Sequence, residues 1–104
     1  VPKECVHNAH MFYMKCRGLS ERTALIAYLR DRDVQSTFHY IPLHSAPAGR
    51  KFGRFAGDDV YTTAESERIV RLPMYYGLAE EDQDRVIEAV RAFFASSLTS
   101  KRKE

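Results

Sequence analysis

Two histidines and a tyrosine lie close together where a predicted strand passes into a loop. The sequence reads H-Y-I-P-L-H from position 39 to 44. In α/β folds, strand ends and the loops that follow them commonly carry ligand contacts. His39, Tyr40 and His44 could therefore donate hydrogen bonds to a sugar or phosphate oxygen, and Tyr40 could also stack on a ring. The structural alternative places His39 half-buried in the strand and Tyr40 in the core.

The loop that follows carries a second group of candidates, the basic residues Arg50 and Lys51. Arg54 is close by, and Phe52 and Phe55 are interspersed with these cations. Guanidinium groups match the geometry of phosphate oxygens, so this segment could bind an anion. The alternative is an ordinary basic loop in contact with solvent.

Near the N-terminus, Cys5, His7 and His10 supply ligand types that zinc accepts. Their C-x-H-x2-H spacing matches none of the usual closed zinc motifs and lacks an obvious fourth ligand, so we predict no metal site. The sequence contains no glycine-rich phosphate loop and no G-x-S-x-G motif. None of its lysines stands out as a Schiff-base residue, and we predict no catalytic residue within the chain.

The apolar pattern predicts the elements that position these residues. Strands are expected at residues 10–17, 36–41 and 72–76. Helices are expected over residues 21–32, just after residue 62 with Ile69 and Val70 included, and from residue 79 onward. Residues 42–61 are expected to form a long ordered loop with packed aromatic side chains.

Local signals refine these expectations. Ser20 is the expected N-cap of the first long helix, and the segment T-T-A-E at 62–65 fits a capping box. On the first strand, Phe12, Met14 and Cys16 share the face expected to enter the core.

These elements predict a small α/β domain, an α+β two-layer sandwich with a three-stranded sheet and helices mainly on one face. A right-handed crossover between the first two strands would leave room for the third strand between them, antiparallel to both. The other face of the sheet would stay uncovered and would need a partner surface.

Composition bounds the possible functions. The chain has 104 residues, of which 44% are hydrophobic, enough for one domain with a modest core. No apolar run is long enough for a membrane helix, and no signal-peptide pattern opens the sequence. The two cysteines indicate a reduced, cytoplasmic protein rather than a disulfide-stapled one. Because no Met begins the chain, we expect a trimmed or excised segment, and the alternative is that processing removed the initiator Met.

The net positive charge of the chain comes from its C-terminal residues. Of the 16 basic and 14 acidic residues, three basic and one acidic lie at positions 101–104, which leaves 13 of each sign in the body. A neutral body argues against nucleic-acid binding. We expect a domain over residues 1–95 and a frayed basic tail over residues 96–104.

Several segments together resemble one family, the nucleotide-sugar aminotransferases of the DegT/StrS type. They are N-A-H-M-F-Y at 8–13, F-H-Y-I-P-L-H-S-A-P-A-G at 38–49, F-G-R-F at 52–55, Y-T-T-A-E-S-E-R at 61–68 and R-L-P-M-Y-Y at 71–76. The resemblance covers residues 1 to about 95 in order, and the string at 38–49 is its most specific part. Two positions depart from the family pattern: Asp33 stands where glycine is frequent, and Ala79 begins the last helix without a strong cap.

The resemblance implies the C-terminal small domain of a pyridoxal-phosphate enzyme of fold type I. Such enzymes are homodimers that transfer an amino group, typically from glutamate, to a dTDP-linked 4-keto-6-deoxy sugar, here dTDP-4-keto-6-deoxyglucose for bacterial cell-surface polysaccharides. Their large N-terminal domain carries the cofactor lysine, so this chain alone should bind no cofactor and be inactive. The uncovered sheet face would then pack against the large domain.

By the same resemblance, His39, Tyr40 and His44 lie near the sugar or diphosphate, and Arg50 and Lys51 are candidates for phosphate or dimer contacts. No nucleic acid and no membrane is expected as a partner. One rival hypothesis is a stand-alone small α/β ligand-binding module. Another is a nucleic-acid-binding domain that uses the basic tail and residues 50–54.

Overall fold

The computed structural model describes the backbone of residues 1–102 and the side chains of residues 1–96. Its strands are β1 (Phe12–Lys15), β2 (Thr37–Phe38) and β3 (Ile69–Leu72). Its α-helices are α1 (Leu19–Arg30), α2 (Pro47–Phe52), α3 (Thr62–Ser66) and α4 (Glu80–Arg102), and a 3-10 helix, η1, spans Leu43–Ser45.

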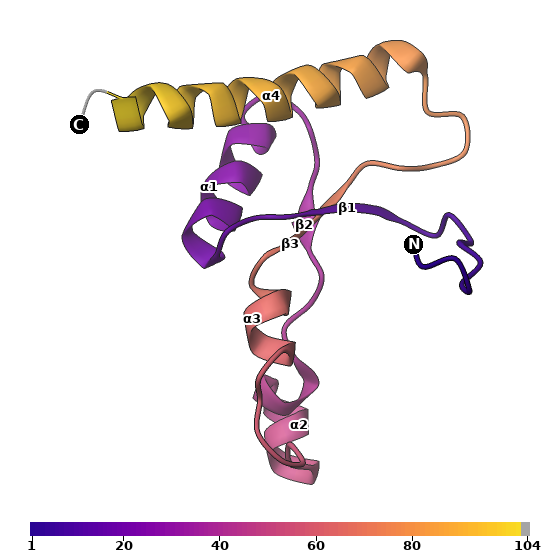
Figure 1. Cartoon of the computed structure of the whole chain (residues 1–104), viewed down its shortest axis with the longest axis vertical. Helices are drawn as coiled ribbons and strands as arrows, with labels where there is room; N and C mark the ends of the chain where they lie inside the picture. Colours follow the sequence, from indigo (N-terminus) through magenta and orange to yellow (C-terminus); the bar gives the residue numbers. More distant parts are fainter. Residues whose placement is uncertain (103–104) are drawn as a thin grey trace.

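The three strands form one antiparallel sheet in the order β1-β3-β2. Met14 of β1 and Phe38 of β2 both face Val70 of β3 in the register. The predicted position of the third strand, between the other two and antiparallel to them, is therefore confirmed. Helices α1 and α4 complete the small α/β fold (Figure 1).

All three strands have different bounds from those predicted, and β1 covers only the middle of the predicted strand over residues 10–17. β3 begins at Ile69, where a helix was expected, and ends before Pro73 instead of running to residue 76. The β-branched pair Ile69 and Val70 favours a strand, and proline cannot donate to a sheet ladder. β2 ends at Phe38, so His39 and Tyr40 lie beyond the sheet rather than inside a strand.

Helix α1 begins two residues earlier than predicted, at Leu19, and Ser20 is not its N-cap. Gly18 occupies that position, and the Glu21 carboxylate accepts the Arg17 backbone N–H at 3.0 Å instead. After the helix, Asp33 adopts a left-handed φ of 58°. This conformation explains why glycine suits the position, and aspartate is one of the few other residues that tolerate it.

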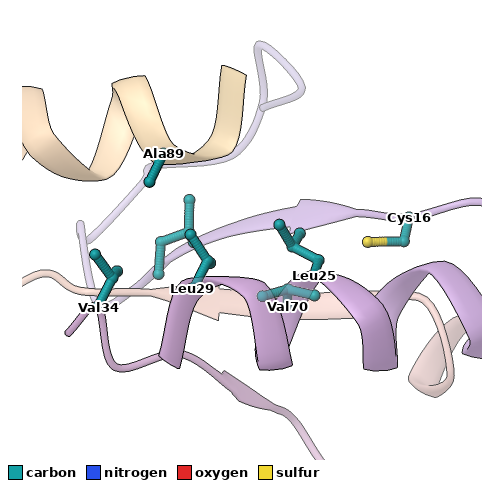
Figure 2. Close-up of a cluster of buried hydrophobic side chains, with 7 residues drawn as sticks. Cys16, Leu25, Leu29, Val34, Val70 and Ala89 are labelled. Carbon is teal, nitrogen blue, oxygen red and sulfur yellow. The ribbon is translucent and has the colours of Figure 1, made fainter. Parts of the chain in front are cut away.

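The core lies between α1, the sheet and α4, as Figure 2 shows. Leu25 and Leu29 of α1 and Val70 of β3 are fully buried, and Cys16 is 1% exposed. Ala89 of α4 also belongs to the cluster and lies at the end near Leu29, away from Cys16. Burial is also the main cause of the raised pKa of the Cys16 thiol, with the Glu21 carboxylate adding to it.

The face of β1 predicted to enter the core does so only at its C-terminal end. Cys16 is buried and Met14 packs against the core, but Phe12 is 60% exposed. On α4, Phe93 meets Tyr28 edge to face, with ring centroids 5.3 Å apart. The apolar face of α4 therefore contacts α1.

Helix α4 starts as predicted, with the Ala79 carbonyl accepting the Gln83 N–H at 3.0 Å. It continues to Arg102, past residue 95, so much of the segment expected to be a frayed tail is helical. Residues 103–104 of that predicted tail lie outside the described residues. Within residues 1–102, no helix has both the length and the apolar character needed to cross a bilayer.

Residues 43–66, here called the arm, replace the long loop that the sequence predicts. They contain η1, α2 and α3 and project away from the sheet on the side opposite α4 (Figure 1). Pro47 opens α2, where its fixed φ favours a first helical turn. The arm makes the molecule extended: its radius of gyration is 16.5 Å, against about 13 Å for a compact domain of this size.

Candidate functional site

His44 lies on η1 and is the centre of a polar cluster in the arm. Its Nε2 is 3.0 Å from Asp59 Oδ2, and Thr63 Oγ1 lies 3.5 Å from the same nitrogen. Thr63 also donates its hydroxyl to Asp59. The cluster therefore connects η1 to α3, although 15 residues separate His44 from Asp59 in the sequence.

Asp59 holds this position because it also caps α3. Its Oδ1 accepts the backbone N–H of Thr63 at 3.1 Å, which satisfies one of the unpaired donors of the first helical turn. The predicted capping box at residues 62–65 is wrong: Tyr61 is the N-cap, and no side chain at that position makes the cap bond. Asp59 supplies the capping oxygen from just before the helix.

Electrostatics favour the ionised form of Asp59. The hydroxyl and the backbone N–H of Thr63, followed by His44, hold the pKa of the Asp59 carboxyl below its usual range. A carboxylate can only accept hydrogen bonds, so the proton shared with His44 resides on Nε2. The pair is partly exposed, with 22% and 26% of the two side chains accessible.

An open cavity of about 590 Å³ lies beside His44. Its wall is largely apolar, and the ring of Phe55 meets the His44 ring edge to face at 4.7 Å between centroids. The other lining residues that matter here are Phe52, Arg54 and Thr62. An apolar wall with a few polar groups is typical of a site for a small organic ligand.

The structure brings only one of the predicted binding residues, His44, to this cavity. His39 and Tyr40 stack edge to face with ring centroids 3.6 Å apart, and they do not line it. Tyr40 is 64% exposed, which excludes the alternative that places it in the core. His39 is half-buried, and its Nδ1 is buried without a hydrogen bond to any described residue.

Arg50 and Lys51 lie on α2 and are exposed. The Lys51 ammonium is 5.2 Å from the centroid of the Phe52 ring, and Arg54 rather than these two residues borders the cavity. The expectation that the aromatic residues of this segment are packed is wrong for Phe52, which is 80% exposed. The binding roles of Arg50 and Lys51 stay predictions.

A second polar cluster ties the arm to the body of the molecule. Glu65 of α3 pairs with Lys15 of β1 at 2.6 Å and with Arg68 at 2.9 Å. Arg68 also donates to the Cys16 carbonyl at 2.8 Å, and Arg22 of α1 donates to the Ser66 carbonyl at 3.1 Å. The hydrogen bond from Lys15, together with the Arg68 charge, lowers the pKa of the Glu65 carboxyl.

The N-terminal cysteine and histidines do not form a ligand cluster. Cys5 is exposed, and His7 Nδ1 accepts the Ala9 N–H at 2.8 Å. Among the residues that the structure describes, no three His, Cys, Asp or Glu side chains gather as metal ligands would.

Sequence reasoning missed Asp59 and Thr63. An aspartate shortly before a helix start is a capping signal, and D-D at 58–59 precedes the predicted helix. That signal could have identified Asp59 as a cap. Its contact with His44 depends on how η1 and α3 meet, which the sequence pattern does not specify.

Comparisons with known proteins place this geometry in context. The sequence pattern of the DegT/DnrJ/EryC1/StrS aminotransferase family matches residues 1–91. The chain is 36% identical over 86 residues to the dTDP-3-amino-3,4,6-trideoxy-alpha-D-glucose transaminase of Micromonospora megalomicea subsp. nigra, covering 81% of this chain and 23% of that protein. It is 35% identical over 72 residues to the spore coat polysaccharide biosynthesis protein SpsC of Bacillus subtilis (strain 168), with 67% and 18% covered.

The fold is also similar to that of a solved aminotransferase. The crystal structure of the aminotransferase TlmJ from Streptoalloteichus hindustanus matches with a TM-score of 0.80 at 28% identity, over 94% of this chain and 25% of that one. The chain spans about a quarter or less of the length of these relatives. Because the family pattern extends over residues 1–91, the chain belongs to the DegT/DnrJ/EryC1/StrS aminotransferase family.

Proposed function

We propose that this chain is the small C-terminal domain of a pyridoxal-phosphate-dependent sugar aminotransferase, and that its arm contacts the sugar nucleotide. The amino donor is glutamate and the acceptor dTDP-4-keto-6-deoxyglucose, as expected of a dTDP-4-amino-4,6-dideoxygalactose transaminase. Family membership and the dTDP-sugar transaminase among the relatives support this reaction class. Similarity to the spore coat polysaccharide biosynthesis protein of Bacillus subtilis supports a role in cell-surface polysaccharide synthesis.

The observation that carries the proposal is the fixed position of His44 at the wall of an apolar cavity. The cavity has the size and lining of a site for a small organic ligand. The imidazole is held by Asp59 at 3.0 Å, so it can offer a hydrogen bond with little loss of side-chain entropy. Such a residue positions substrate and does not break bonds itself. His39, Tyr40, Arg50 and Lys51 are proposed as further contacts, outside this cavity.

We propose that pyridoxal phosphate is not held by this chain. The cofactor requires a lysine amine and a partner for its ring nitrogen. The lysines whose side chains the structure describes are Lys3, Lys15 and Lys51, and none of them lines the cavity beside His44. We therefore assign no chemical step to this chain. The cofactor would be held by another part of the enzyme, and the chain alone is expected to be inactive.

The partners proposed for this chain are a large N-terminal domain and the second subunit of a homodimer. Large apolar side chains of the arm stand in solvent: Leu43 is 79% exposed and Tyr61 75%. Exposed apolar surface of this kind marks sites that other protein surfaces cover. The cytoplasmic location expected from the sequence stays a prediction.

The test is the substitution His44→Ala in the full-length enzyme that carries this chain. Loss of one substrate hydrogen bond should reduce kcat/KM for the keto sugar by roughly tenfold, while kcat/KM for glutamate stays the same. His10→Ala, which changes an exposed histidine near the N-terminus, is the matched control. An unchanged kcat/KM for the keto sugar would refute the positioning role.

The intact mass of the native protein separates this proposal from the stand-alone binding module. A mass several times 12.0 kDa supports the aminotransferase domain. A native mass close to 12.0 kDa would contradict it and leave the binding module as the explanation.

A further inference from the structure

We infer that Asp59 is a positioning residue that holds the His44 ring so that its Nδ1 accepts a hydrogen bond from a hydroxyl group of the sugar. The inference deepens the proposed function and rests on it. It assigns a role to a residue that sequence reasoning did not single out, and it specifies which part of a sugar nucleotide His44 contacts.

The first step concerns which ring nitrogen is already in use. In the described part of the chain, both hydrogen-bond contacts of the His44 ring are made by Nε2, with Asp59 Oδ2 at 3.0 Å and Thr63 Oγ1 at 3.5 Å. Because the Asp59 carboxylate can only accept, Nε2 carries the proton that they share. In the neutral ring, Nδ1 then carries no proton, and its lone pair can accept a hydrogen bond.

The second step concerns what keeps Asp59 in place. Its Oδ1 accepts the Thr63 N–H at 3.1 Å, and its Oδ2 accepts the Thr63 hydroxyl. The same two contacts, followed by His44, lower the pKa of the Asp59 carboxyl, which keeps it an acceptor at neutral pH. Asp59 is thus fixed to the start of α3 and can fix the imidazole in turn, as carboxylates do for histidines elsewhere.

The third step follows from the chemistry of the two halves of the ligand. A sugar hydroxyl can donate to the Nδ1 lone pair, whereas an ionised diphosphate offers only acceptors. The cation on the wall of the same cavity is Arg54, whose guanidinium suits phosphate oxygens. The geometry therefore assigns the hydroxyl-bearing sugar, and not the diphosphate, to His44.

The test measures binding of two unreactive probes, dTDP-glucose and dTDP, to the full-length protein by titration calorimetry. Asp59→Asn should weaken the binding of dTDP-glucose by roughly tenfold. The amide of asparagine can pair with either tautomer of the His44 ring, so it no longer fixes which nitrogen carries the proton. Binding of dTDP should stay within about twofold. Asp58→Asn, a substitution of the neighbouring exposed acid, is the control and should change neither affinity.

A double-mutant cycle tests whether Asp59 acts through His44. If it does, Asp59→Asn should have no further effect on dTDP-glucose binding in a His44→Ala background. The inference would be overturned if Asp59→Asn weakened dTDP-glucose binding as much in that background as in the unmodified protein. It would also be overturned if Asp59→Asn weakened the binding of dTDP and of dTDP-glucose equally.

Asp59→Asn retains an oxygen for the Thr63 N–H. If it nevertheless lowers the thermal midpoint, Thr63→Val replaces it, and a loss confined to dTDP-glucose is again expected.

The outcomes separate this inference from the proposed function. If the unmodified protein binds neither probe, the proposed function fails. If the unmodified protein binds both probes, and His44→Ala weakens the binding of dTDP-glucose but Asp59→Asn does not, only the role of Asp59 fails.

Discussion

The body of the molecule, made of the sheet, α1 and α4, differs from the arm in what holds it together. The body contains fully buried aliphatic side chains, among them Leu25, Leu29 and Val70. No residue of the arm, 43–66, is buried. The arm instead depends on polar contacts, chiefly those of His44 with Asp59 and of Glu65 with Lys15 and Arg68.

Because of this difference, we expect the body to determine the stability of the fold and the arm to carry the ligand contacts. Burial of apolar area drives folding of the body, at about 25 cal/mol per Å² removed from water. The arm lacks that contribution, and its large apolar groups face outward, with Phe52 80% and Val60 63% exposed. Loops that carry ligand contacts on a rigid scaffold are often less stable than the scaffold. The comparison predicts that substitutions in the body affect folding and that substitutions in the arm affect binding.

The largest effect is expected for Leu29→Ala in the body. Leu29 is 0% exposed, so the substitution leaves a cavity and should reduce the free energy of unfolding by about 2–5 kcal/mol. Urea denaturation followed by circular dichroism measures it. Leu43→Ala in the arm is the matched control, because Leu43 is 79% exposed and should cost at most about 0.5 kcal/mol. If the two substitutions reduced the free energy of unfolding by similar amounts, the proposed difference between the body and the arm would be wrong.

An intermediate effect is expected for Gly49→Ala within the arm. A Cβ at Gly49 would collide with the Leu43 carbonyl, so η1 and α2 would have to separate. We expect a loss of about 1–3 kcal/mol, the usual cost of overpacking, together with weaker binding of dTDP-glucose. Chemical denaturation and calorimetry measure the two quantities.

Gly53→Ala provides the control for this close approach. A Cβ there would lie 3.5 Å from the Gly49 carbonyl, which is an ordinary contact. Because this contact requires no separation of η1 from α2, the free energy of unfolding of Gly53→Ala should stay within about 0.5 kcal/mol of that of the unmodified protein. If Gly49→Ala and Gly53→Ala have the same free energy of unfolding, the packing of η1 on α2 does not stabilise the arm.

The body could be predicted from the sequence because its signals are local and periodic. Leu25 and Leu29 recur at helical spacing and form the buried face of α1, and the crossover rule placed the third strand between the other two. The main error in the body concerned Val70, which was assigned to a helix. Its β-branched neighbour Ile69 and the following proline favour the strand that forms.

The arm could not be predicted to the same extent. Its short helices lack an apolar period, because their large side chains face solvent rather than a core. His44 was identified from its residue type and its place after a strand. Asp59 was not, since its contact with His44 spans 15 residues and depends on how two short helices meet. A pattern that reports burial contains little information about a segment in which no residue is fully buried.

The smallest effect is expected where the arm joins the body, for Glu65→Gln. Lys15 and then Arg68 lower the pKa of the Glu65 carboxyl in the folded state. A lowered pKa stabilises the folded protein above the ordinary glutamate pKa of about 4.3, and this contribution disappears as the pH falls through the folded-state value. The stability difference between the unmodified protein and Glu65→Gln should therefore be present at neutral pH and vanish in acid.

Urea denaturation at pH 7 and at pH 3 measures this difference, and Glu67→Gln, which removes a charge outside the cluster, is the control. Glu65 is part of the arm, whereas Lys15 belongs to β1. Loss of their ion pair should therefore free α3 from the sheet more than it affects the core. Hydrogen exchange should increase at the amides of α3 and stay slow at Leu25 and Leu29. An equal increase at the buried leucines would show that arm and body unfold as one unit, and the comparison between them would then fail.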